Sequence, residues 1–145
     1  CGDDDDLFPD DVQDEVMTEW IEPYHEKNST LDDVKAYMAS SMKNHHLVKE
    51  THSAENVQLA YSTSDINVGV LYSFSTVSGS LYSVIDTELT INSPVVINYL
   101  QKHYRLVSSN EASLQYCFTI QDKSMVINTV KVSETCFNIN YSFVY

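Results

Sequence analysis

Short runs in which apolar and polar residues alternate recur six times along this chain of 145 residues. A period of two is typical of strands that bury one face of a sheet. The last run is the cleanest, because Phe137, Ile139, Tyr141 and Phe143 alternate with polar neighbours. Turn residues separate the runs, so we expect antiparallel strands joined by short connections. The six runs span residues 57–61, 66–74, 81–89, 114–120, 125–132 and 137–145.

Each group of three runs follows a segment with helical spacing. Thr30 and Asp33 have the spacing of a capping box, which predicts a helix from residue 30 to about residue 44. Asn92-Ser93-Pro94 is a strong start for a second helix, because a capping residue precedes a proline in the first turn.

The two groups also resemble each other in sequence. Val34–Met38 aligns with Val96–Leu100, and the strand residues that follow align in the same order. Such a repeat predicts two αβββ halves, residues 30–90 and 92–145. The predicted fold class is therefore α+β: an antiparallel sheet with the helices on one face, preceded by an N-terminal helix.

The negative charge is concentrated before this domain. The first thirty residues hold eleven acids and one base, whereas the whole chain has a net charge of −13. Residues 1–9 are expected to form an extended tether, because neighbouring aspartates repel one another. Residues 10–29 predict a helix and a linker, since apolar residues recur at helical spacing up to Trp20 and Pro23 ends the pattern. A single domain of residues 30–145 follows.

The chain opens with Cys1-Gly2-Asp3-Asp4-Asp5-Asp6. This opening resembles the mature start of a bacterial lipoprotein, and the acids after the cysteine are similar to the surface-export signal of Bacteroidetes lipoproteins. The resemblance covers six residues and lacks the Lys or Gln often found beside the acids. It implies a lipid on the Cys1 thiol, a membrane as partner, and a place on the bacterial outer membrane, surface-exposed rather than facing the periplasm.

The composition and the motifs argue against several activities. Eight basic residues against twenty-one acidic ones disfavour a nucleic-acid partner. The sequence has no nucleophile elbow and no glycine-rich phosphate loop, so no catalytic residue is assigned and no cofactor is expected. Asp86 and Glu88 are the best acidic pair, and they are expected to be solvated at a strand end.

Three histidines near the end of the first predicted helix are weak candidates for a metal site: His45, His46 and His52. Zinc needs three or four ligands that converge on one point. Their spacing matches no zinc motif, and histidine at a helix C-terminus is favoured by the helix dipole. His103 at the matching end of the second predicted helix supports this structural interpretation.

Two cysteines besides Cys1 lie in strand-like sequence. Cys117 and Cys136 fall on the same predicted face, so a disulfide is possible. If the strands form a simple meander, however, the strand between them would hold the two cysteines too far apart. The same face carries small and polar side chains that are weak candidates for a binding surface: Gln115, Thr119, Asn138 and Asn140.

The sequence predicts a non-catalytic lipoprotein of the cell envelope. It would be a binding or accessory module that presents a sheet face or groove to a protein, a peptide or a glycan. One alternative is a small envelope hydrolase or inhibitor, which would need a pocket with convergent titratable groups. A second alternative is a metal-binding lipoprotein that uses the three histidines.

Overall fold

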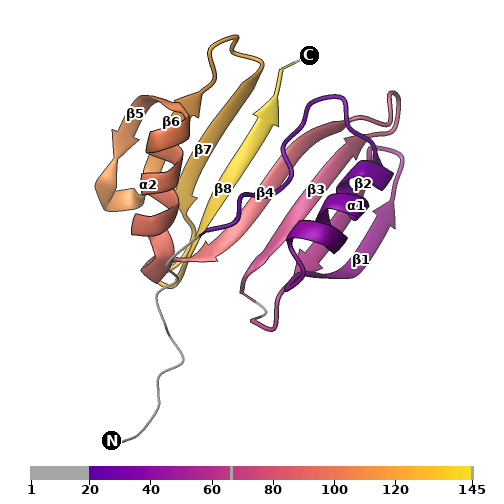
Figure 1. The fold of residues 1–145 in the computed structure, drawn as a ribbon, viewed down its shortest axis with the longest axis horizontal. Coiled ribbons are helices and arrows are strands. Elements are labelled where there is room, and N and C mark those ends of the chain that lie inside the picture. Colours follow the sequence, from indigo (N-terminus) through magenta and orange to yellow (C-terminus); the bar gives the residue numbers. More distant parts are fainter. Residues whose placement is uncertain (1–19, 66, 145) are drawn as a thin grey trace, which may run out of the picture.

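A computed structural model describes residues 20–65 and 67–144, which form one eight-stranded antiparallel sheet and two short helices (Figure 1). The helices are α1 (Leu31–Ser41) and α2 (Ser93–His103). The strands in chain order are β1 (His46–His52), β2 (Asn56–Ser62), β3 (Gly69–Ser75), β4 (Leu81–Leu89), β5 (Arg105–Asn110), β6 (Gln115–Thr119), β7 (Met125–Lys131) and β8 (Cys136–Phe143).

The order of the strands in the sheet is β1-β2-β3-β4-β8-β7-β6-β5. A helix followed by four strands therefore occurs twice, and the last strands of the two groups, β4 and β8, pair at the centre. The first strands, β1 and β5, lie at the two edges. This arrangement leaves the two central strands between the helices rather than beneath them (Figure 1).

The predicted α+β class, with two αβββ halves and an N-terminal helix, is wrong. The chain is mainly a sheet, and each group contains four strands rather than three. Residues 20–22, at the end of the predicted helix 10–22, form neither helix nor strand. The rest of that helix and the predicted tether lie outside the described residues. The helix prediction fails at residues 20–22 because Trp20 and Glu22 are buried and Ile21 between them is 50% exposed, an alternation of period two rather than the period of a helix.

The two strands that the sequence analysis missed are exposed edge strands. In β1 every residue is exposed except Thr51, which is half-buried, and in β5 every residue is exposed. Both strands also contain a register shift, at Val48 in β1 and at Val107 in β5. An edge strand without a buried face has no reason to alternate, so the period-two pattern is lost.

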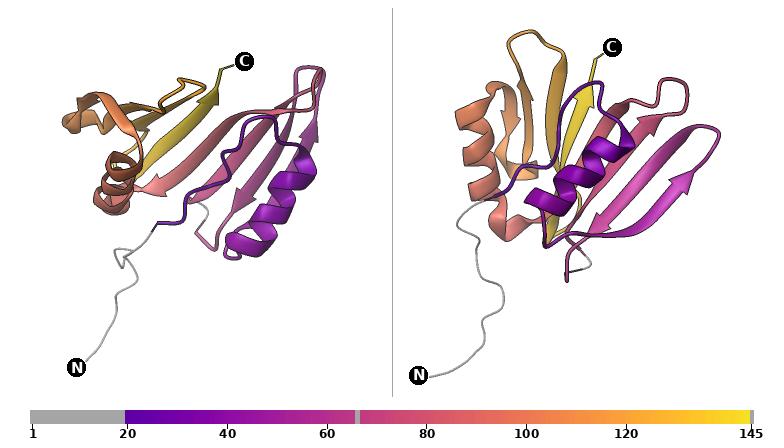
Figure 2. Two further views of the ribbon diagram at one scale, coloured as in Figure 1. Left: turned by 45° about the horizontal axis from the view of Figure 1, so that its top comes forward. Right: turned by 45° about the vertical axis from the view of Figure 1, so that its right-hand side comes forward.

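The helix starts are confirmed, although α1 ends earlier than predicted. Thr30 and Asp33 form the reciprocal capping box, and Pro94 lies in the first turn of α2. The helix α1 ends at Ser41 instead of residue 44. Figure 2 shows both helices on the same side of the sheet, each over its own half.

A row of six side chains crosses this side of the sheet, one from each of the six inner strands. Each of the six is completely buried and pairs in register with the next. Val34 and Met38 of α1 and Val96 and Leu100 of α2 belong to the same core. The row consists of Leu59, Tyr72, Val84, Tyr141, Ile127 and Phe118.

Two glycines give a matched test of the packing of β3. A Cβ atom at Gly69 would lie 2.3 Å from the backbone oxygen of Tyr61, whereas a Cβ atom at Gly79 would meet nothing within 4 Å. We expect Gly69→Ala to lower the free energy of unfolding by about 3 kcal/mol, because backbone must move to relieve the clash. Gly79→Ala should cost only about 1 kcal/mol, from its positive φ of 73°.

Urea unfolding of both variants measures these values. Equal losses in the two variants would contradict the close approach of β2 and β3 at Gly69.

Candidate functional site

The space between the helices is filled by residues 20–29, which we call the strap. In Figure 1 the strap crosses the sheet between α2 and α1, and its far end joins β4 through a hydrogen bond from Leu81 N to Ser29 O of 2.8 Å. Tyr24 N donates to the hydroxyl of Tyr72 in β3 at 3.1 Å. Hydrogen bonds to β3 and β4 therefore hold the strap on the sheet.

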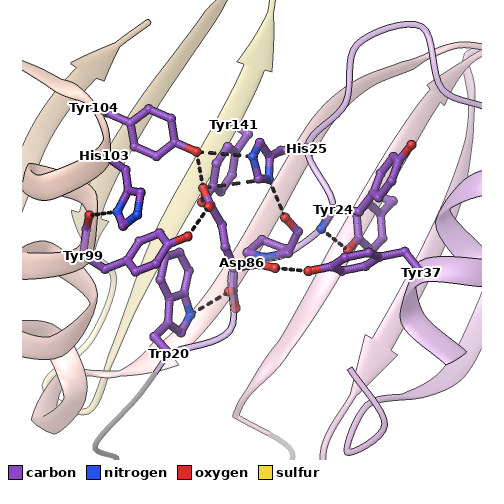
Figure 3. Close-up of polar contacts among 12 residues, drawn as sticks. Trp20, Tyr24, His25, Tyr37, Asp86, Tyr99, His103, Tyr104 and Tyr141 are labelled. Atoms are coloured by element: carbon purple, nitrogen blue, oxygen red, sulfur yellow. Dashed lines mark hydrogen bonds and ion pairs between the residues drawn. The ribbon is translucent and has the colours of Figure 1, made fainter. Parts of the chain in front are cut away.

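The carboxylate of Glu22 is the centre of the strap. It is buried, and it accepts hydrogen bonds from the hydroxyls of Tyr99, Tyr104 and Tyr141 at 2.9, 2.5 and 2.8 Å (Figure 3). The hydroxyl of Tyr37 donates to the backbone oxygen of Glu22 at 2.6 Å. One residue is therefore fixed by side chains from both helices, from the segment after α2 and from β8.

We call Glu22 and the three tyrosines that donate to its carboxylate the Glu22 cage. These tyrosines are held in their neutral form, in which the hydroxyl donates. Burial, and then the hydrogen bond to Glu22, raise the pKa of Tyr99 to about 12. The pKa of Tyr104 is raised well above its usual range by the same causes. Burial and the charge of Glu22 raise the pKa of Tyr141. An ionised tyrosine would place a second negative charge against the Glu22 carboxylate. The arrangement therefore favours protonated tyrosines, whose hydroxyls donate hydrogen bonds.

His25 completes this cluster on the strap. Its ring stacks on Tyr141 with centroids 5.5 Å apart, and its Nδ1 hydrogen-bonds the backbone oxygen of Pro23 at 2.8 Å. The sequence analysis assigned Glu22 and His25 no role, because it placed them at a helix end and in a linker. The tyrosines that bind Glu22 lie 77, 82 and 119 positions away from it, so the sequence carries no local signal for this site.

Asp86 and Glu88 are a buried acidic pair, and the expectation that they are solvated is wrong. They are 0% and 6% exposed. Asp86 Oδ2 accepts a hydrogen bond from Trp20 Nε1 at 3.3 Å (Figure 3). Burial and then the charge of Glu88 raise the pKa of Asp86 well above its usual range, and burial raises the pKa of Glu88. The pair therefore retains a proton at a pH where exposed carboxyls are ionised.

Glu88 also lines a cavity of about 290 Å³, which we call the Trp20 cavity. Its walls include Trp20, Ile21, Met42, His45 and Val68. This cavity brings together the start of the strap, the turn after α1 and the end of β4.

The three candidate histidines do not converge. His45 lies in the Trp20 cavity, His46 begins β1, and His52 ends β1, where its Nε2 contacts Glu50 at 2.7 Å. Burial and then His46 lower the pKa of His45. Among the described residues, no group of three or more His, Cys, Asp or Glu side chains could hold a metal ion.

The two cysteines do not form the possible disulfide. Cys117 in β6 and Cys136 in β8 are both free, and β7 lies between their strands. Cys117 is in register with Asn128 of β7, which faces Asn140 rather than Cys136 of β8.

The four candidate binding residues lie on the side of the sheet away from the helices, which we call the open face. Gln115 and Thr119 belong to β6, and Asn138 and Asn140 belong to β8, with β7 between them. The hydroxyl of Thr87 donates to Asn138 Oδ1 at 2.7 Å. Asn140 Oδ1 is buried, and no residue within the described ranges hydrogen-bonds to it.

The open face is also hollowed, and its inner part is uncharged. Of the described strands, only the edge strands bring charged side chains to this side, since Lys49 of β1 pairs with Ala60 and Arg105 of β5 pairs with Thr119. A depression of about 510 Å³ is lined by residues of β2, β3, β4 and β8, including Leu71, Ile85 and Asn138. In the six inner strands, no side chain that the pairing register places on this side is charged. The face thus offers amides, hydroxyls and small apolar groups to a ligand.

No protein-family model, curated protein or solved structure matches this chain. Cys1 and the acidic run that follows it lie outside the described residues. In the part of the chain that is described, neither helix has the length and apolarity needed to cross a bilayer.

Removing the Glu22 carboxylate should destabilise the whole fold. We expect Glu22→Ala to lower the free energy of unfolding by about 2–4 kcal/mol, because three tyrosine hydroxyls lose their acceptor. Denaturant unfolding measures this loss. Glu26→Ala is the matched control on the exposed side of the strap and should stay within about 0.5 kcal/mol of wild type. Equal losses of stability in Glu22→Ala and Glu26→Ala would contradict the role of the Glu22 carboxylate in holding the fold together.

The acidic pair makes stability depend on pH. Because the folded-state pKa of Asp86 is raised, folding stability is greatest below the unfolded carboxyl pKa of ~3.9 and falls as the pH rises toward the folded value. Asp86→Asn removes this penalty. We expect the variant to gain on wild type by up to about 1.4 kcal/mol per pH unit above pH 4.

Urea unfolding at pH 4, 6 and 8 measures the difference. Asp122→Asn is the control, because the hydrogen bond from the backbone of Ser124 lowers the pKa of Asp122. The contribution of Asp122 to stability therefore rises with pH, so its replacement should have the opposite pH dependence. A difference between Asp86→Asn and wild type that is independent of pH would refute the buried proton.

Proposed function

We propose that this protein is a non-catalytic lipoprotein of the bacterial cell envelope that binds an uncharged polar ligand on its open face. The observation that supports this most is the contrast between the two sides of the sheet. The strap fills the helix side through Glu22 and its tyrosines. Neither helix nor the strap, within the described part of the chain, lies on the open face, and the six inner strands place no charged side chain on it in a chain whose net charge is −13.

The side chains on the open face indicate the ligand. Amide and hydroxyl groups such as those of Asn138, Asn140 and Thr119 both donate and accept hydrogen bonds. Peptide backbones and glycan hydroxyls present the same groups, and neither needs a charged partner. The unpartnered Asn140 Oδ1 is an acceptor for such a donor. A protein surface, a peptide or a glycan of this kind is the proposed partner.

A hydrolase has weaker support. Glu88 and His45 share the Trp20 cavity, but no hydrogen bond joins the His45 ring nitrogens to any described residue. General acid–base chemistry needs a base oriented toward the group that it deprotonates. The histidines likewise give the metal-binding alternative no convergent ligand set within the described ranges.

The second part of the proposal is a lipid anchor on Cys1. A lipid on Cys1 would attach the chain through the tether, in which residues 2–9 could reach about 25–30 Å at ~3.3–3.6 Å per residue. The aspartates would be repelled by an anionic lipid surface, which favours a domain held away from it. We place the domain on the outer surface of the outer membrane.

Photo-crosslinking in cells tests the open face. Asn128 is exposed, and it lies on the open face between Cys117 and Asn140. We expect Asn128→p-benzoylphenylalanine to give a discrete adduct on illumination. The same substitution at Val77, 95% exposed in a turn, should give none. Adducts at both positions, or at neither, would refute binding at the open face.

The anchor is tested in the same cells. Cys1→Ser should move the protein from the membrane fraction to the soluble fraction, and added protease should release the wild-type domain from intact cells. An unchanged distribution of the Cys1→Ser variant would contradict the lipid anchor. Protection of the wild type until the outer membrane is opened would place the domain in the periplasm.

A further inference from the structure

The Trp20 cavity lies on the helix side of the sheet, and the proposed function does not use it. Its apolar walls come from Trp20, Ile21, Met42 and Val68, and Glu88 provides a carboxyl group. A volume of about 290 Å³ is at the small end of the range for ligand sites. The cavity therefore fits a short apolar chain with one polar end.

The acidic side of the cavity makes no ion pair among the described residues, although Lys43 also lines the cavity. Asp86 is completely buried behind Glu88 and Trp20, and its Oδ1 has no hydrogen-bond partner within the described ranges. Neither carboxyl forms an ion pair with a Lys, Arg or His among the described residues. The proton that the pair retains leaves one negative charge, and a buried negative charge without an ion-pair partner is unfavourable, so a cation placed beside Glu88 would be stabilised.

His45 adds a second polar group that has no partner. Both ring nitrogens are buried, and no described residue hydrogen-bonds to either of them. A neutral imidazole offers one nitrogen lone pair as an acceptor. A carboxylate and an imidazole acceptor together match a group with several N–H donors, and the face of an indole ring also attracts cations.

We propose that the Trp20 cavity is a binding site for a small alkylammonium ligand, with its alkyl chain against Ile21, Met42 and Val68 and its ammonium group between Glu88 and His45. An anion would be repelled by the acidic pair. A metal ion would need a third ligand, and the described residues provide no such group. The proposal is independent of what binds the open face.

Fluorescence titration tests this site directly, because Trp20 is the single tryptophan of the chain and forms part of the wall. The probes are n-butylamine and 1-butanol, added at pH 8 to the full chain. An alkylamine is protonated at this pH, since its pKa resembles that of lysine, ~10.4. We expect a saturable change in Trp20 emission with n-butylamine and a dissociation constant at least about tenfold larger for 1-butanol.

Two variants make the test specific. Glu88→Gln keeps the shape of the side chain and removes its charge, so n-butylamine affinity should fall at least about tenfold. Lys43→Gln removes the one lysine that lines the cavity, and it should leave n-butylamine affinity unchanged or increase it. The proposal is overturned by an absence of saturable change, by equal affinity for amine and alcohol, by unchanged affinity in Glu88→Gln, or by loss of binding in Lys43→Gln.

Discussion

The structure depends on a single buried carboxylate, that of Glu22, which three tyrosine hydroxyls surround. A carboxylate that leaves water loses a large solvation free energy and needs several donors in compensation. The donors come from α2, from the residue that follows it and from β8. With Tyr37 of α1 on its backbone oxygen, Glu22 connects both helices to the centre of the sheet. Each helix lies over its own half of the sheet, and the strap covers the centre.

This covering explains why the two sides of the sheet differ in character. On the helix side, polar groups such as Glu22 and Asp86 are buried and mostly paired within the chain. On the open face, the side chains of the six inner strands are uncharged and mostly half-buried, and Asn140 keeps an acceptor that no described residue uses. A surface with few charges in a strongly acidic protein is suited to a neutral partner, because the acidic groups lie elsewhere.

The sequence predicts the inner strands well and the site poorly, and both results have physical reasons. Phe137, Ile139 and Tyr141 alternate because one side of β8 is buried, and this pattern is readable locally. The edge strands β1 and β5 have no buried face and therefore no pattern. The Glu22 cage joins residues 77, 82 and 119 positions apart, so no local window reveals it. A carboxylate in an acidic segment is ordinarily solvated, and only the tertiary fold buries it.

The burial of Asp86 and Glu88 could have been recognised from the strand itself. Val84, Asp86 and Glu88 share one face of β4, and Val84 is completely buried. A period of two therefore places both acids toward the core, but their charge favoured a solvated strand end instead. A strand can bury acids only where a donor and a proton compensate them, and Trp20 of the strap provides the donor.

The strand β4 also separates the two proposed binding surfaces. Ile85 and Thr87 face the open side, and Asp86 and Glu88 face the helices. Seven residue pairs join β4 to β8, so the strand cannot rotate to exchange its faces without losing its register. A ligand in the Trp20 cavity and a partner on the open face therefore contact alternate side chains of one rigid strand. The two surfaces meet at Val68, which lines both the Trp20 cavity and the depression of the open face. Substitutions within β4 on one face should leave binding on the other unchanged, because successive side chains of a strand point to opposite sides of the sheet.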